Sequence, residues 1–380
     1  PNTGASADNE PAVSDVPAYS SWDEVTAAAQ GTTVNWFVWG GSETINSHVD
    51  GVIGKALQEA FDITLNRVPL DNTADAVNKV LNEKAAGRDS GGSIDLIWIN
   101  GENFRTLKEA DLLYGPFVDL VPNSLLVDWE NPAIAYDFGV AVDGYESPWA
   151  SFQWVLEYNS ATVGENPPTT FEELKTWIEA NPGRFTYPAL PNHVGAAFVR
   201  QLFYWAAGSS EPFLDDFDQA IFDETAPLVW DYLNTIEPNL WRAGQTYPEL
   251  AAMTDLLANQ ENDFNMEYDS SRASTYIREG IYPYTIRTTV FDSGTLANVS
   301  YGAIPYNASN PAGAMVVANY LLSPLYQTTM TKPDVLGWRM AIEPDRLNEA
   351  EQAQLMQETQ SEATCLLYTS DAADEGVGGW

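Results

Sequence analysis

One apolar run that stops at a polar loop constrains the fold of this chain more than any other stretch. Residues 94–99 are largely apolar and lack the alternation of a strand with one wet face, so they suit a parallel strand covered on both sides. The next four residues are Asn100, Gly101, Glu102 and Asn103. They fall at the carboxyl end of that strand, where open α/β sheets bind their ligands.

The residues of this loop have the chemistry of a binding loop. Asn103 is expected to cap the next helix, whose first turn offers unpaired backbone N–H groups, and Gly101 lets a ligand approach the main chain. The alternative interpretation is a strand followed by an ordinary capped turn.

The preceding residues predict a β-α-β-α-β unit. It consists of a strand at 33–39, a helix to about 60, a strand at 63–68, a helix at 75–86 and the strand at 94–99. Such a unit calls for a parallel sheet with the first strand between the second and the third. The turn formed by Trp39, Gly40, Gly41 and Ser42 therefore lies at the same edge as the Asn100 loop, and together they indicate a site.

The rest of the chain predicts a second lobe inserted into the first. We expect an α/β fold with lobe one at 21–150 plus 295–330 and lobe two at 156–290, each a mostly parallel sheet flanked by helices. Residues 331–364 form a C-terminal helical segment that the sequence assigns to neither lobe. Two crossings between lobes make a hinge over an interlobe cleft, the geometry that closes around a ligand.

The two ends of the chain are expected to lie outside the fold. Residues 1–20 are polar and aperiodic, as in a disordered tether. Residues 365–380 resemble the translation of a transposase-type sequencing adapter, so they are interpreted as an artefact that cuts off the natural sequence near Thr364. Cys365 is the only cysteine, which leaves neither a disulfide framework nor a cysteine metal site.

Composition narrows the function classes. The formal charge is −37, from 54 acidic against 17 basic residues, and this argues against nucleic acid as a partner because phosphate contacts need Lys and Arg. No apolar run reaches the ~18 residues of a membrane helix. An acidic surface with little lysine is typical of an extracytoplasmic protein. It fits either a protein from a saline habitat or an ordinary acidic secreted protein.

Catalytic and metal patterns are scarce. His48 and His193 stand in no recognisable motif, and the sequence has no nucleophile elbow, Walker A loop or calcium loop. We therefore expect no cofactor and no metal. Paired carboxylates such as Glu102 and Glu146 leave a hydrolase open as an alternative, although nothing in the sequence sets their separation.

Aromatic and charged residues complete the predicted site. Trp149, Tyr187 and Tyr268 are expected to face the two loops from the hinge and lobe two, although aromatic side chains are often simply core. Arg184, and likewise Arg200, is placed to neutralise an anion or else to pair with a surface acid. The full predicted ligand-binding set is Trp39, Gly40, Gly41, Ser42, Asn100, Gly101, Glu102, Asn103, Trp149, Arg184, Tyr187 and Tyr268.

The charge of the ligand follows from the same residues. The acids in or beside the predicted site, Glu43, Glu102, Glu146 and Glu267, outnumber the nearby cations, and carboxylates combined with indole rings suit organic cations. The hypothesis is a small cationic or zwitterionic solute, with a neutral sugar and an anion as alternatives.

Several segments together resemble a known family, the solute-binding proteins of ABC importers with a two-lobed type II periplasmic-binding fold, and within it a YnjB-like branch. The resemblance covers roughly residues 21–364. The segments that carry it are 34–42, 94–104, 144–149, 182–185 and 318–324, the last containing Leu321, Leu322, Ser323 and Pro324.

The resemblance implies a non-enzymatic monomer that captures a small-molecule ligand outside the inner membrane and delivers it to an ABC permease. It implies a periplasmic or extracellular location. Anchoring to the membrane by a lipid on a removed N-terminal segment is compatible with this location. A secreted carbohydrate-active hydrolase and a surface adhesion protein remain the alternative functions.

Overall fold

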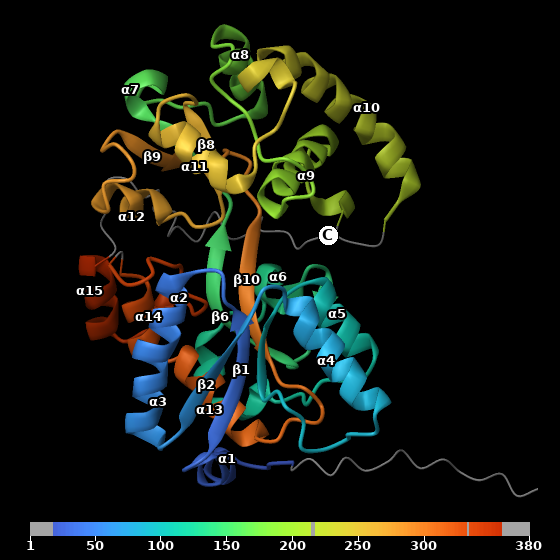
Figure 1. The fold of residues 1–380 in the computed structure, drawn as a ribbon, viewed down its shortest axis with the longest axis vertical. Helices are drawn as coiled ribbons and strands as arrows, with labels where there is room; N and C mark the ends of the chain where they lie inside the picture. Colours follow the sequence, from blue (N-terminus) through green and yellow to red (C-terminus); the bar gives the residue numbers. More distant parts are fainter. Residues whose placement is uncertain (1–17, 214–216, 333, 359–380) are drawn as a thin grey trace, which may run out of the picture.

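The computed structural model describes residues 18–213, 217–332 and 334–358. The expected tether covers residues 1–20, of which 1–17 lie outside these ranges, and the expected adapter-derived end at 365–380 lies outside them entirely. Figure 1 shows the chain gathered in two halves, one around a five-stranded sheet and one around a three-stranded sheet. They are called the large-sheet half and the small-sheet half below.

The five-stranded sheet has the predicted core topology. Its strands, in spatial order, are β2 (Thr64–Leu70), β1 (Thr33–Trp39), β3 (Leu96–Ile99), β10 (Ala297–Ala303) and β6 (Glu146–Gln153). β1 pairs in parallel with both β2 and β3, which confirms that the first strand lies between the second and the third. β10 runs antiparallel to β3 and β6, because it enters this sheet from the other half.

Strand β3 is buried on both faces, as its apolar run predicts. Leu96 packs in one hydrophobic core, whereas Ile97 and Ile99 pack in another, because successive side chains of a strand point to opposite faces. The first core is covered by α1 (Trp22–Ala29), α2 (Glu43–His48), η1 (Val49–Ile53), α3 (Gly54–Phe61), α13 (Pro311–Leu321) and α14 (Pro324–Met330). The second is covered by α4 (Thr73–Ala85) and α5 (Glu102–Glu109).

The C-terminal segment packs on the large-sheet half. Leu336, Trp338, Ile342, Leu347 and Leu355 all join the core that contains β1. The elements of this half not yet described are η2 (Val118–Leu120), η3 (Pro122–Leu126), α6 (Pro132–Ala135), β4 (Tyr136–Asp137), β5 (Val140–Ala141), η7 (Pro344–Arg346) and α15 (Glu349–Glu358). The segment that the sequence left unassigned thus has a place in the fold.

The smaller sheet is not mostly parallel, and this part of the prediction is wrong. Its order is β8 (Phe264–Glu267), β7 (Val155–Asn159) and β9 (Ile286–Thr289), and both pairings are antiparallel. β7 enters from the large-sheet half and β9 leads back to it, so the two run in opposite directions. Residues 184–188 form no strand of this sheet, since Pro188 has no N–H to donate and the carbonyl of Phe185 accepts from the Trp241 N–H at 2.8 Å.

Helices enclose the smaller sheet and build its core. They are α7 (Ser160–Val163), α8 (Phe171–Ala180), α9 (His193–Ala207), η4 (Glu211–Phe213), α10 (Gln219–Ile236), η5 (Glu237–Asn239), η6 (Trp241–Gly244), α11 (Leu250–Ala258) and α12 (Arg272–Arg278). Thr170 caps α8 by accepting from the N–H of Glu173 at 3.1 Å.

Two strand connections join the halves (Figure 1). One runs from β6 to β7, and the other from β9 to β10. They are tied together at the junction, where Trp154 N–H donates to the Leu296 carbonyl at 2.8 Å and Gln153 N–H donates to the Tyr268 carbonyl at 3.1 Å. The predicted lobe boundaries remain a prediction, since they concern which residues move together. Over the described ranges, no helix is long and apolar enough to cross a membrane.

Candidate functional site

The turn after β1 lies at the edge of the large sheet that faces the other half (Figure 1), and its two glycines are required sterically. A Cβ on Gly40 would lie 2.6 Å from the Cβ of Pro69, and a Cβ on Gly41 would lie 2.3 Å from the ring of Trp39. The Trp39 indole therefore rests against Gly41, and 42% of this side chain is exposed.

Hydrogen bonds hold this turn in place. Gly40 N–H donates to the Leu70 carbonyl at 2.9 Å, and Asn46 Nδ2 donates to the Gly40 carbonyl at 2.9 Å. Ser42 caps α2 by accepting from Ile45 N–H at 3.4 Å. The exposed indole is thus presented from a fixed backbone.

The loop after β3 is also anchored by its own groups. Asn100 Nδ2 donates to the Val299 carbonyl, and Gly101 N–H donates to the Asp137 carboxylate. Gly101 has φ 57°, and a Cβ there would lie 3.3 Å from the Phe138 ring, so this position favours glycine.

Asn103 does not cap the following helix, contrary to the expectation. α5 begins one residue earlier, at Glu102, with Gly101 as the capping residue and no side-chain cap bond. The positive φ of Gly101 turns the chain directly into the helix, which leaves Asn103 inside the first turn. Glu102 is exposed, and Asn103 is partly buried.

Beneath this loop lie two buried carboxyl groups, Asp137 and Glu146, which are 2% and 0% exposed. Burial raises the pKa of Asp137 to about 7, although the Gly101 N–H partly opposes this shift. Burial, and then the charge of Asp137, raise the pKa of Glu146 well above its usual value, against the attraction of Lys108. Because Glu146 is enclosed while Glu102 is exposed, these two acids do not line one open catalytic site.

Three predicted residues are engaged by partners elsewhere in the fold. Trp149 is 1% exposed and packs with its ring 4.9 Å from that of Trp98 and 5.5 Å from that of Trp338. Tyr187 is 7% exposed, with its ring 4.9 Å from that of Tyr247. The expectation that these aromatics face the loops is therefore wrong in this conformation, because partners distant in sequence enclose them.

The third of these residues, Arg184, is committed to an acid. Its Nε donates to Asp263 at 2.7 Å and its Nη2 to the same carboxylate at 2.5 Å. Its Nη1 donates to the Gln260 carbonyl at 2.7 Å. The ion-pair alternative that the sequence left open for Arg184 is the one observed.

Tyr268 lies at the junction of the halves. Its ring stacks on His193, with centroids 5.9 Å apart and planes at 17°, and its carbonyl binds the Gln153 N–H. Burial raises the pKa of the Tyr268 hydroxyl, and the charge of Arg200 opposes the shift, so Arg200 is nearby. Three expected features are thus found at the junction and the edge facing it: the Trp39 turn, the Asn100 loop with its Glu102, and Tyr268.

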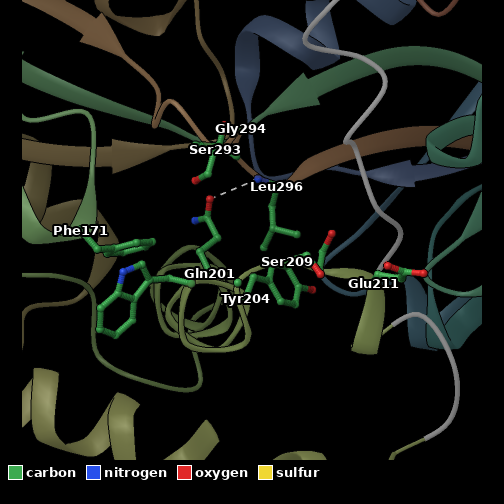
Figure 2. Close-up of a pocket in the computed structure, with 12 residues that line it drawn as sticks. Phe171, Gln201, Tyr204, Ser209, Glu211, Ser293, Gly294 and Leu296 are labelled. Atoms are coloured by element: carbon green, nitrogen blue, oxygen red, sulfur yellow. Dashed lines mark hydrogen bonds between the residues drawn. The ribbon is translucent and has the colours of Figure 1, made fainter.

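A pocket that the sequence did not predict lies in the small-sheet half (Figure 2). It has a volume of about 520 Å³ and is bounded by α9, the turn after it and the segment before β10. The sequence could have indicated this pocket only through two short polar turns, at residues 208–210 and 293–295. The sequence alone does not show that these two turns lie side by side, because that depends on the tertiary structure. Among the described residues, no group of acids, histidines or cysteines is arranged to hold a metal ion.

Comparison with known proteins identifies the class of protein that has this fold. The family described as bacterial extracellular solute-binding protein matches residues 53–339, and the chain belongs to it. Its members are non-enzymatic components of ABC transporters.

Among curated proteins, the chain is similar to Protein YnjB of Escherichia coli K12, with 36% identity over 337 residues that cover 88% of this chain and 86% of that protein.

Solved structures with low sequence identity share the fold. One is the spermidine/putrescine substrate-binding protein PotD of Streptococcus pneumoniae, with TM-score 0.62 and 13% identity, covering 86% of this chain and 91% of that one. Another is an ABC transporter substrate-binding protein from Bradyrhizobium japonicum, with TM-score 0.61 and 17% identity, covering 86% and 90%.

Proposed function

We propose that this chain captures a small cationic or zwitterionic organic solute between its two halves and presents it to an ABC permease. The Trp39 indole carries the proposal, because it is exposed at the sheet edge that faces the other half and is held there by a rigid turn. A ring face in this position binds a cation or the face of a sugar.

Charge favours the cation. Glu43 and Glu102 are exposed beside the two edge loops, whereas Arg184, one of the two cations offered for an anion, is paired with Asp263. The Streptococcus neighbour is named for polyamines, which agrees with this choice, but at 13% identity its likeness concerns the fold. The remaining route to an anion is Arg200, near Tyr268.

The experiment begins with a thermal-shift screen of polyamines, quaternary amines, amino acids, sugars and oxyanions, since a ligand at 100 times its Kd stabilises by ~2.7 kcal/mol. Each hit is then measured by calorimetry on Glu102→Gln, with Glu109→Gln at the far end of the same helix as the matched control. We expect a cation to bind Glu102→Gln more weakly by ~1.5–3 kcal/mol and the control unchanged.

Two results would contradict the cation. One is an affinity that Glu102→Gln leaves unchanged. The other is tight binding of an oxyanion that is lost in Arg200→Gln, which would assign the site to an anionic solute while leaving the family unaffected.

A further inference from the structure

The pocket of the small-sheet half is built by segments far apart in the chain. Its residues come from the start of α8, the last turns of α9, the turn that follows and the segment leading into β10 (Figure 2). They are Phe171, Gln201, Tyr204, Trp205, Gly208, Ser209, Ser210, Glu211, Ser293, Gly294, Thr295 and Leu296. None of the described lining residues belongs to the large-sheet half or to the site predicted from sequence. The pocket adjoins the proposed interlobe site without sharing its residues, since Leu296 lies at the junction and the charge of Arg200 acts on both Tyr204 and Tyr268.

The floor of the pocket is already formed. Gln201 is 4% exposed; its Oε1 accepts from Leu296 N–H at 3.2 Å, and its Nε2 donates to the Ala197 carbonyl at 3.2 Å. This amide therefore fastens α9 to the segment that crosses between the halves, as Figure 2 shows. The volume of about 520 Å³ lies in the ~300–1,000 Å³ range of small-molecule sites.

Most electrostatic features of the lining favour positive charge. Glu211 is the only charged side chain among the lining residues that the structure describes, although the charge of Arg200 reaches the lining at Tyr204, where it opposes the burial that raises the pKa of that hydroxyl. α9 ends at Ala207, and the carbonyl end of a helix carries partial negative charge. Phe171, Tyr204 and Trp205 add aromatic rings, whose faces are electron-rich.

The polar atoms of the lining are partly committed and partly available. Trp205 Nε1 donates to Glu172 at 2.7 Å, which places a second carboxylate next to this indole. Within the described ranges, Thr295 Oγ1 is buried without a hydrogen-bond partner.

We propose that this pocket is a second binding site, for a small organic cation with an apolar body. The aromatic rings hold the apolar part, while Glu211 and the carbonyl end of α9 hold the charge. An anion is disfavoured, because no described lining residue is Lys or Arg. This site does not depend on the ligand of the interlobe site.

The probe is choline, compared with its uncharged isostere 3,3-dimethylbutan-1-ol. Both are titrated against the Glu102→Gln protein, so that the interlobe site is already weakened. Hydrogen exchange then reports where each compound protects the backbone. We expect choline to protect residues 204–211 and 293–296 saturably and to bind at least about tenfold more tightly than the isostere.

Variants distinguish binding in this pocket from nonspecific attraction of choline to the acidic surface. Glu211→Gln should weaken choline about two- to fivefold, the range of one exposed charge contact. Glu165→Gln, another exposed acid of the same half, should leave binding unchanged. Ser209→Trp fills the pocket from an exposed position and should abolish the protection, with its melting temperature checking that the fold is intact.

The proposal is overturned if choline gives no saturable protection of the two segments, if the uncharged isostere protects them equally, or if Ser209→Trp binds choline as well as its parent. Failure here leaves the interlobe proposal untouched, because that proposal is tested with Glu102→Gln against Glu109→Gln in the wild-type background.

Discussion

Two buried glutamates on consecutive strands differ in whether the surrounding half provides them with a counter-charge and hydrogen-bond donors. Glu157 on β7 and Glu146 on β6 are both 0% exposed. Glu157 accepts from Arg272 Nη2 at 2.8 Å, from the Tyr282 hydroxyl at 2.7 Å and from Asn265 Nδ2 at 3.1 Å. Over the residues described, the Glu146 carboxyl has no hydrogen-bond partner.

The difference follows from what each strand packs against. β7 lies beneath α12, which supplies Arg272, and a buried charge is tolerated when it is paired and hydrogen-bonded. β6 brings Glu146 to Asp137 instead, and two enclosed carboxyls favour the neutral acid. The small-sheet half therefore depends on an ion pair, whereas the large-sheet half contains groups that resist ionisation.

The largest expected effect comes from breaking the Glu157 pair. Arg272→Met removes the guanidinium and leaves Glu157 buried without its counter-charge, and also frees Glu267, whose carboxylate lies 2.8 Å from Arg272. We expect the free energy of unfolding to fall by ~3–5 kcal/mol in urea denaturation. Arg272→Met combined with Glu157→Gln should recover part of the loss. A loss below about 1 kcal/mol would show that the pair does not govern this half.

The second prediction concerns pH and the large-sheet half. Burial raises the pKa of Asp137 in the folded protein to about 7. Between pH ~4 and 7 the folded protein therefore binds more protons at this carboxyl than the unfolded chain does, so the free energy of unfolding falls as the pH rises through this range. Asp137→Asn keeps an acceptor for the Gly101 N–H and removes the titration. We expect the free energy of unfolding of this variant to exceed that of the wild type by roughly 1–3 kcal/mol at pH 7, and the difference to disappear near pH 4.

Urea denaturation at several pH values measures this difference, and Asp119→Asn, at an exposed position of the same half, is the control. Glu146→Gln should follow the same pH trend as Asp137→Asn. A gain that is independent of pH would mean that the buried carboxyls are already ionised in the folded protein.

The sequence could predict the parts of the structure that depend on neighbouring residues, but not the contacts between residues far apart in the chain. The β2-β1-β3 order and the turn after Trp39 follow from local patterns, since strand periodicity and glycine turns involve neighbouring residues. Trp149 and Tyr187 were misplaced because their burial depends on Trp338 and Tyr247, which lie 189 and 60 residues further along the chain. The pairing of Arg184 with Asp263, 79 residues away, was equally beyond local pattern and stayed one of two alternatives.

The smallest effect is expected at this last pair, the partly exposed counterpart of Glu157 and Arg272. The Arg184 side chain is 32% exposed, so water screens part of its charge, whereas the Asp263 side chain is only 4% exposed and keeps the Thr162 hydroxyl as a donor at 2.6 Å. Arg184→Met should therefore cost about 1–2 kcal/mol of unfolding free energy, less than the loss of Arg272. Arg184→Lys distinguishes charge from geometry, because lysine keeps the charge but cannot reproduce the two-pronged contact with Asp263. Similar losses in both variants, measured in parallel by urea denaturation, would assign the effect to geometry, whereas a stable lysine variant would assign it to charge. Both variants should bind the solute of the interlobe site with unchanged affinity in calorimetry, since Arg184 is already held by Asp263; a weakened affinity would return Arg184 to the binding site.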